Sequence, residues 1–217
     1  MSALKYPRTM HWPTSPGLQG DDRVTQFPLM MIGVPLVITE KLDGGNCCLY
    51  QGEVYARSTG QPSTAGWFAM VRKHHAWKTT AVDDWLFYGE DLYGVHSIEY
   101  GAMPEDSTFR LFALRRPEGG FAEWDFVELA AEEYGFQTVP VLFQGKFRNE
   151  KELSDWFESE IKNPSNLNGE REGFVARHSG PILEDEFHYR VVKYVRAGHV
   201  QTNEHWTRNW QPCKIIR

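Results

Sequence analysis

The stretch "ITEKLDGGNCCLY" (residues 38–50) places a lysine at the end of an apolar segment and follows it with an aspartate and two glycines. Leu36 to Ile38 is apolar and β-prone, so Lys41 is expected close to the end of a buried strand. Partial burial disfavours an ammonium ion and favours the neutral, nucleophilic amine. The glycines let the chain turn and bring backbone N–H groups close to a bound phosphate. On this string alone, an ordinary solvated turn is the commoner explanation.

The composition is that of a globular protein, with 41% hydrophobic and 24% charged residues among 217. No apolar run approaches the ~20 residues of a membrane helix, and the first ten residues lack a signal-peptide core. The three cysteines, two of them adjacent, form neither a disulfide framework nor a zinc spacing, so a cytoplasmic protein without membrane contact is expected. The net charge of −6 argues against binding nucleic acid through bulk charge, but it leaves room for a local basic groove.

Short strands and three helices are predicted along the chain. Period-two and apolar patterns predict strands at 36–42, 46–50, 54–57, 84–90, 108–114, 173–177 and 189–195. Apolar residues at helical spacing predict helices at 66–77, 124–134 and 150–161. Residues 1–30, rich in proline, glycine and polar residues, are expected to be an extended N-terminal arm lying over the domain. No repeat or linker divides the chain, so residues 1–217 are expected to form a single α+β domain.

Other charged and aromatic residues stand at the ends of predicted strands. Arg57 suits bidentate binding of a phosphate, and Glu90 stands where a carboxylate can accept a ribose hydroxyl. Phe109 and Phe112 offer faces on which a base can stack. Each of these residues has an ordinary structural explanation when taken singly.

Two further groups follow later in the chain. Glu172 precedes the strand at 173–177, where its carboxylate can hold Mg²⁺ against a triphosphate. Lys193 and Arg196 provide a second cationic group. The order in which all these residues occur makes coincidence a poor explanation.

Five short motifs in this order resemble those of the covalent nucleotidyltransferase superfamily of polynucleotide ligases and capping enzymes. KLDGGN (41–46), FYGE (87–90), FRLFAL (109–114), EGFV (172–175) and VVKYV (191–195) are similar to its motifs I, III, IIIa, IV and V. Together they span most of the chain. Asn46 and the segment WLFYGEDLYGVHSIEY (85–100) resemble the ATP-dependent RNA ligase branch more than the DNA ligases.

The resemblance implies a nucleotidyltransferase core, similar to ATP-grasp, of antiparallel sheets flanked by helices. It also implies an ATP-dependent RNA ligase acting in RNA repair or end-joining. Lys41 would attack the α-phosphorus of ATP, release pyrophosphate and carry AMP as lysyl-AMP. AMP would pass to the 5′-phosphate of an RNA strand, and a 3′-hydroxyl would then displace it. Such in-line displacement needs positioning and charge neutralisation more than acid–base chemistry.

The motif residues acquire roles from the same resemblance. Glu90 would contact the ribose, Phe112 would stack on adenine and Lys193 would contact the α-phosphate. Arg57 would bind a phosphate, such as that of the RNA end, and Asn46 would lie close to the reacting phosphate.

Three acidic residues complete the expected site. Glu172 would hold the divalent metal, Mg²⁺ or Mn²⁺, which neutralises the leaving pyrophosphate. Glu40 and Asp43, which flank the lysine, are assigned to nucleotide binding.

Departures from the family pattern keep other functions open. Ala113 stands where the family usually has aspartate, and motif V has one lysine, Lys193, with Arg190 or Arg196 available for the second charge. A minimal DNA ligase, and a nucleotide- or RNA-end-binding module that has lost ligation, are therefore alternatives. The segment after motif V is too short for an OB-fold, so none is expected. Arg196 and Arg208 in this tail are weaker candidates for RNA binding.

Overall fold

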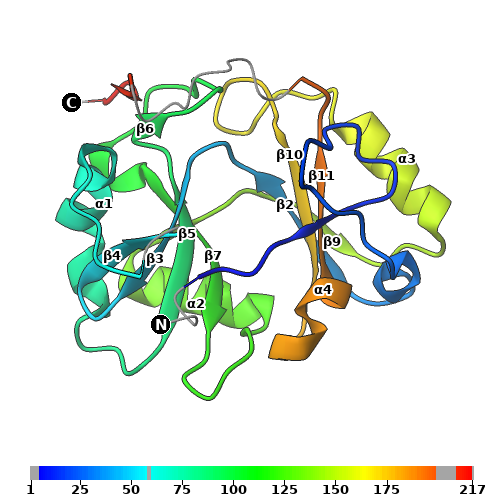
Figure 1. The fold of residues 1–217 in the computed structure, drawn as a ribbon, viewed down its shortest axis with the longest axis horizontal. Coiled ribbons are helices and arrows are strands. Elements are labelled where there is room, and N and C mark those ends of the chain that lie inside the picture. The colour runs from blue at the N-terminus through cyan, green and yellow to red at the C-terminus, as the bar shows by residue number, and fades with distance from the viewer. Residues whose placement is uncertain (1–4, 58–59, 199–208, 217) are drawn as a thin grey trace.

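The computed structural model describes residues 5–57, 60–198 and 209–216, and its strands form two large sheets with helices on their outer sides (Figure 1). The first sheet has the strand order β1 (Met10–His11), β11 (Val191–Val195), β10 (Gly173–His178), β2 (Leu36–Lys41), β9 (Val141–Gly145). The second has the order β4 (Glu53–Ala56), β3 (Gly45–Tyr50), β5 (Leu86–Asp91), β7 (Phe109–Arg115), β8 (Gln137–Thr138). Neighbouring strands are antiparallel except for the short pairs β1–β11 and β7–β8.

The helices and the remaining short elements lie around these sheets. The α-helices are α1 (Ala69–His74), α2 (Trp124–Tyr134), α3 (Glu150–Glu160) and α4 (Phe187–Arg190). The 3₁₀ helices are η2 (Pro28–Met31), η3 (Gly66–Phe68), η4 (Ala76–Thr79), η5 (Glu105–Ser107) and η6 (Glu184–Glu186). A small sheet pairs β6 (Gly94–Val95) with β12 (Gln211–Pro212). The expected α+β fold of antiparallel sheets flanked by helices is confirmed. In the described part of the chain, no helix has the length and apolarity needed to cross a bilayer.

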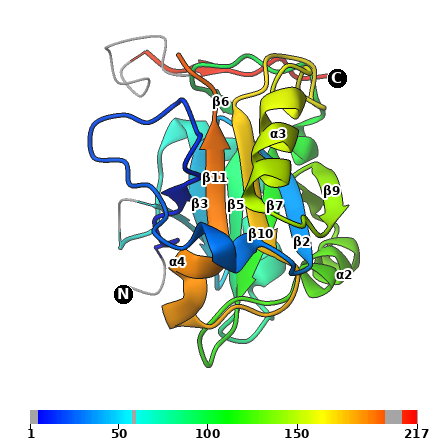
Figure 2. The same cartoon turned by 90° about the vertical axis from the view of Figure 1, so that its right-hand side faces the viewer.

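Strand β2 is apolar throughout its first half because both of its faces are covered. Leu36 and Ile38 pack in one cluster with Phe157 of α3, which lies across the outer face of the first sheet (Figure 2). Side chains alternate along a strand, so Thr39 and Lys41 belong to the opposite, inner face. Lys41 thus ends a strand that tertiary packing fixes on both sides.

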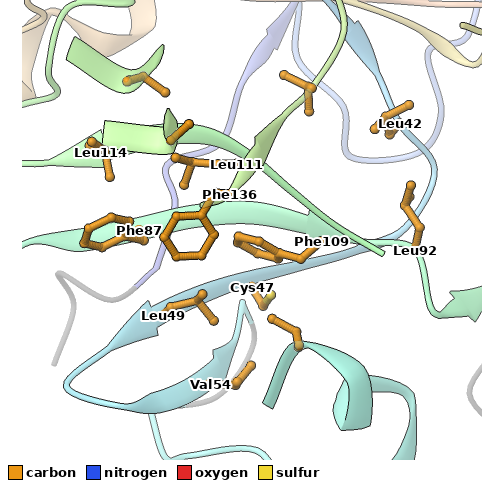
Figure 3. Packing of buried hydrophobic residues seen from close by; sticks show 14 of the residues in the cluster. Leu42, Cys47, Leu49, Val54, Phe87, Leu92, Phe109, Leu111, Leu114 and Phe136 are labelled. Atoms are coloured by element: carbon orange, nitrogen blue, oxygen red, sulfur yellow. The ribbon is translucent and has the colours of Figure 1, made fainter. Parts of the chain in front are cut away.

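The second sheet shows the same alternation. Cys47, Leu49 and Phe87 pack with Trp124 and other residues of α2 in the largest hydrophobic cluster (Figure 3). Their strand neighbours face the other way: Cys48 and Tyr88 join a second cluster with Val191 of the first sheet. This inner cluster holds the two sheets together, and the adjacent cysteines therefore serve two different cores.

Two predicted elements differ in kind from the structure, and one of the longer strands was not predicted. The strand predicted at 189–195 starts at Val191, because Tyr189 and Arg190 complete the short helix α4. The helix predicted at 66–77 is divided into η3, α1 and η4; the break falls at His75, whose buried ring bonds to the Asp106 carbonyl. Strand β9 was not predicted at all; it is an edge strand whose pairing with β2 includes a register shift.

Candidate active site

A cavity of about 400 Å³ lies between the inner faces of the two sheets, within the size range of small-molecule sites. The first sheet contributes Thr39, Glu40, Lys41, Val175, Arg177 and Lys193 to its wall. The second contributes Asn46, Glu90 and Phe112, and Arg57 follows β4. Eight of the sequence-predicted site residues are thus accounted for, seven in the wall and Glu172 bonded to Lys41.

Strand register explains how distant parts of the chain meet at this cavity. Val175 of β10 pairs with Thr39 of β2 on one side and with Lys193 of β11 on the other. Paired residues share a face of the sheet, so Lys193 lies on the same inner face as Thr39 and Lys41. In the second sheet Asn46 pairs with Glu90 in the same way.

Lys41 and Glu172 form a close ion pair. The Lys41 Nζ donates to Glu172 Oε1 at 2.5 Å, while the buried Glu172 Oε2 has no hydrogen-bond partner among the described residues. Burial raises the pKa of Glu172 to about 6, although the charge of Lys41 opposes this.

The protonation state of Lys41 differs from the sequence-based expectation. Burial lowers the pKa of Lys41 as expected, but the neighbouring acidic side chains, above all Glu172, outweigh burial and raise that pKa above its ordinary value. The contact with Glu172 therefore favours the ammonium form of Lys41 in the protein alone, whereas burial by itself favours the expected neutral amine.

Glu90 lies in the same acidic neighbourhood. Its Oε1 accepts a hydrogen bond from the Gly44 backbone N–H at 3.2 Å. Burial, opposed by the charge of Lys41, raises the pKa of Glu90 to about 8, which favours the protonated carboxyl group, a form that can donate as well as accept. Gly44 is required for this approach, since a Cβ there would lie 2.5 Å from the Asp91 carbonyl oxygen.

Asp43 supports the site from outside the cavity. Its Oδ2 accepts from the backbone N–H groups of Ser97 at 2.7 Å and Ile98 at 2.8 Å, and its own N–H donates to the Tyr100 hydroxyl at 2.8 Å. The carboxylate thus fixes the loop after β6 against the loop that follows Lys41. The structure does not bring Asp43 into the cavity wall with the other predicted residues.

Glu40 belongs to the cavity wall, and its carboxyl group is buried. Its Oε2 accepts from the Asn166 N–H at 3.0 Å, whereas its buried Oε1 has no hydrogen-bond partner in the described part of the chain. Burial raises the pKa of Glu40. A buried acceptor without a partner is costly unless a ligand supplies the donor.

Phe112, and not Phe109, faces the cavity, and a register shift in the pairing of β5 with β7 falls at Phe112. Tyr88 pairs with Ala113 and Gly89 with Leu111, which leaves Phe112 as the extra residue between the two pairs. Phe109 instead packs in the core, 5.8 Å from the Phe136 ring.

Cationic side chains gather at the cavity although the whole chain is acidic. Lys41, Arg57, Arg177 and Lys193 all line it. Arg196, a candidate for RNA binding, instead pairs with Glu170 at 2.6 Å and is not part of the wall.

Two other cationic residues are candidates from the sequence, one for a second charge beside Lys193 and one for RNA binding. Arg190 pairs with Glu186 at 2.9 Å and also contacts His178, so it does not supply a second charge to the cavity. Arg208 lies outside the described residues.

Sequence reasoning missed the contribution of the N-terminal arm. Tyr6, Arg8 and Asp22 line the cavity, and the Tyr6 ring meets Phe112 at 5.0 Å in an edge contact. No periodicity in the arm signals this role. Arg177 was also missed, yet its place two residues after Val175 in a strand was a usable signal.

The residues present fit a divalent cation bound together with a nucleotide. Glu172 offers a buried carboxylate oxygen without a hydrogen-bond partner among the described residues. Within those residues, no group of three or more His, Cys, Asp or Glu side chains could hold a metal without further ligands. A cation bound through one carboxylate and ATP phosphates needs no such group.

Comparisons with known proteins agree with this geometry. Three solved structures share the fold: a Naegleria gruberi RNA ligase mutant with ATP and Mn (TM-score 0.57, 16% identity), a putative ATP-dependent DNA ligase from Aquifex aeolicus (0.57, 14%) and an archaeal ATP-dependent RNA ligase (0.53, 16%). They match 90%, 88% and 88% of this chain, which spans only 61%, 50% and 48% of theirs. No curated protein sequence matches the chain. The sequence pattern of the RNA ligases matches residues 34–195, three quarters of the chain, and the chain belongs to the RNA ligase family.

Proposed function

We propose that this chain is an ATP-dependent RNA ligase that forms lysyl-AMP on Lys41. The observation that carries the proposal is the meeting of Lys41, Glu90, Phe112 and Lys193 in one cavity, with Glu172 bonded to the lysine. These residues come from both sheets, and two half-buried lysines and a buried glutamate beside one cavity suit a ligand that carries phosphates. The solved RNA ligase with ATP and Mn, similar in fold, supports ATP and a divalent metal as cofactors.

Three residues suit recognition of the nucleoside. Phe112 offers an aromatic face on which adenine stacks. The unpaired Oε1 of Glu40 is an acceptor for the exocyclic amino group of adenine, which guanine lacks at that position, so Glu40 favours ATP over GTP. Glu90 binds the ribose hydroxyls through its carboxyl group.

Cationic groups suit the phosphates. Lys193 binds the α-phosphate, and Arg57 binds a second phosphate, that of ATP or of the RNA end. Asn46, opposite Glu90, contacts the reacting phosphate.

The two oxygens of Glu172 have separate tasks in this proposal. Lys41 must give up a proton before it attacks phosphorus, and Glu172 Oε1 is its hydrogen-bonded acceptor. Oε2 remains for the divalent cation, Mg²⁺ or Mn²⁺, which when bound neutralises negative charge on the phosphates. Asp43 keeps the loop after Lys41 in place and so acts through that lysine.

Ligation then follows as two further transfers. AMP passes from Lys41 to the 5′-phosphate of an RNA strand, and the 3′-hydroxyl of a second strand displaces it. We further propose a single adenylyltransferase domain with the N-terminal segment as an arm, acting in RNA repair in the cytoplasm. Arg196 stays a weaker candidate for contact with RNA.

Labelling with ATP tests the covalent step. The protein is incubated with α-labelled ATP and Mg²⁺, and a labelled band that survives denaturation is expected. Lys41→Ala should remove the label, and Lys41→Arg should remove it as well, because it keeps the charge beside Glu172 without the nucleophile. Glu172→Ala should also abolish labelling. No label on the wild type would favour a nucleotide- or RNA-end-binding module instead.

A panel of substrates separates RNA from DNA ligase activity. Nicked RNA, nicked DNA and single strands with a 5′-phosphate are offered to the labelled protein. Sealing of RNA but not DNA is expected, whereas efficient sealing of nicked DNA alone would favour the minimal DNA ligase, to which the fold is equally similar.

A further inference from the structure

The N-terminal arm is anchored along β11, the strand that carries Lys193. Strand β1 pairs with β11 so that His11 stands beside Lys193, and the Trp12 N–H donates to the Lys193 carbonyl at 2.7 Å. The Trp12 ring is buried and packs against Phe157. The Gly17 N–H donates to the Val195 carbonyl at 2.9 Å. This arm is therefore a fixed wall of the cavity.

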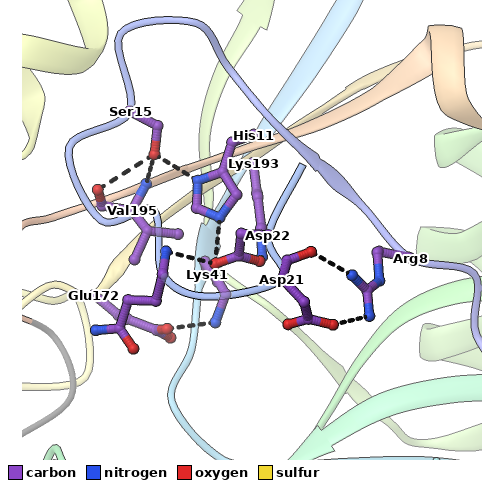
Figure 4. A network of polar contacts seen from close by, with 10 residues as sticks. Arg8, His11, Ser15, Asp21, Asp22, Lys41, Glu172, Lys193 and Val195 are labelled. Carbon is purple, nitrogen blue, oxygen red and sulfur yellow. Dashed lines mark hydrogen bonds and ion pairs between the residues drawn. The ribbon is translucent and has the colours of Figure 1, made fainter. Parts of the chain in front are cut away.

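A chain of polar contacts runs through the arm and back to the same strand (Figure 4). The Val195 N–H donates to Ser15 Oγ at 2.9 Å, and Ser15 Oγ lies 2.8 Å from His11 Nδ1. His11 Nε2 lies 3.1 Å from Asp22 Oδ2, and the Lys193 Nζ donates to Asp22 Oδ1 at 2.9 Å. Both oxygens of Asp22 are thus in contact with a partner.

Ser15, His11 and Asp22 have the residue types of a hydrolase triad, but they do not act as one. A nucleophilic serine must reach its substrate, but Ser15 is buried and its oxygen is bonded to the backbone of Val195. The same contacts are well suited to a different task. Each member fixes the next, and the last member is the ammonium group of Lys193.

We propose that Asp22 is a positioning residue that holds Lys193 toward the reacting phosphate. This inference rests on the proposed function, since Lys193 is assigned there to the α-phosphate. A lysine side chain has four rotatable bonds, so ordering it costs conformational entropy. The hydrogen bond to Asp22 orders the Lys193 side chain before ATP binds, so this entropy is not lost during binding. The ammonium group has three donors, and the bond to Asp22 leaves two for phosphate oxygens.

The charge of Asp22 also favours keeping its contact with Lys193 when the phosphate is bound. Burial alone would raise the pKa of Asp22, but the hydrogen bond and charge of Lys193 and the charge of His11 lower it, so the carboxylate stays ionised. If Asp22 instead blocked the phosphate site, ATP binding would have to move its carboxylate away from Lys193. The carboxylate is instead held from its other side by a fully buried histidine.

Asp22→Asn tests the proposal, with Asp21→Asn as the matched control. Asp21 is the preceding residue, lines the same cavity and carries the same charge, but it pairs with Arg8 and not with Lys193. Its variant therefore removes a cavity carboxylate without releasing the lysine. Asp22→Asn is expected to slow lysine adenylylation at saturating ATP by roughly 10- to 100-fold. The ATP concentration for half-maximal rate should not rise, because a negative charge beside the phosphates has been removed. Asp22→Glu, which keeps the charge, should recover much of the rate.

Rates are expressed per folded molecule, from the fraction that is labelled at completion. Equal slowing by Asp22→Asn and Asp21→Asn would overturn the proposal, as would faster adenylylation of Asp22→Asn at low ATP, which indicates a blocking anion. A wild-type protein that forms no lysyl-AMP would refute the proposed function instead, so the two failures are distinguishable.

A second measurement does not depend on activity. Surface amines are acetylated briefly in the absence of ATP, and modification of the peptide containing Lys193 is followed by mass spectrometry. Lys193 should react several-fold faster in Asp22→Asn than in the wild type or in Asp21→Asn. Equal reactivity in all three proteins would show that Asp22 does not hold the amine.

Discussion

The raised pKa of Glu90 predicts that this residue destabilises the folded protein at alkaline pH. The pKa is about 8 in the folded protein and 4.5 ordinarily, so the folded state favours the protonated form. Stability contributed by a neutral Glu90 is fully present below about pH 4.5 and is lost as the pH rises to 8. At about 1.36 kcal/mol per pH unit, the loss between pH 5 and pH 9 is roughly 4 kcal/mol.

Glu90→Gln isolates this effect, because glutamine has the shape of the protonated acid and can still accept from the Gly44 N–H. The free energy of unfolding is measured by urea denaturation of both proteins at pH 5, 7 and 9. The two should be similarly stable at pH 5, and the variant should be more stable by roughly 4 kcal/mol at pH 9. Glu128→Gln, at an exposed position of α2, controls for the loss of one surface carboxylate.

Parallel pH profiles for wild type and Glu90→Gln would refute this reasoning. They would mean that Glu90 is ionised at neutral pH, with the charge of Lys41 offsetting the cost of burial. Glu90 would then bind ribose only as an acceptor.

Three further predictions concern the nucleotide cavity. Glu40→Gln should reduce the preference for ATP over GTP in adenylylation by roughly tenfold or more, because an amide can also donate to guanine; an unchanged ratio would show that Glu40 does not contact the base. Phe112→Ala should weaken ATP binding, measured by calorimetry, by about 1–3 kcal/mol through lost stacking, whereas equal affinity would place the base elsewhere. Glu172→Gln should lower the pKa of Lys41, seen as an earlier onset, with rising pH, of its reaction with an amine reagent; an unchanged onset would mean that Glu172 does not stabilise the ammonium ion.

Local sequence patterns were sufficient to predict most of the helices and strands that carry the site. Helix α2 begins and ends where its apolar spacing predicts, and β2 is predicted to within one residue. These segments bury residues at the period of their own geometry, so their pattern carries the information. Tyr189 and Arg190 continue the apolar, aromatic pattern of β11 but complete a helical turn, which only tertiary packing decides.

The candidate site divides in the same way. Motif order leads to Lys41 and Glu90, because these residues end strands whose pattern is clear. Phe109 and Phe112 lie on opposite faces of β7 by ordinary alternation, but the sequence does not say which of the two faces meets the cavity. The contact of Asp22 with Lys193 could not be predicted, because it follows from the pairing of β1 with β11, which are far apart in the sequence.

That pairing has a consequence for synthesis on the ribosome. The arm emerges among the first segments of the chain, yet the strand that receives it, β11, is made close to the end of the nucleotidyltransferase core. Until then the hydrophobic clusters of Trp12 and Tyr6 are incomplete, because they include residues of β10 and β11. A nascent chain that stops before β11 therefore lacks both the strand that pairs with the arm and Lys193 of the cavity wall, so the complete cavity forms late in synthesis.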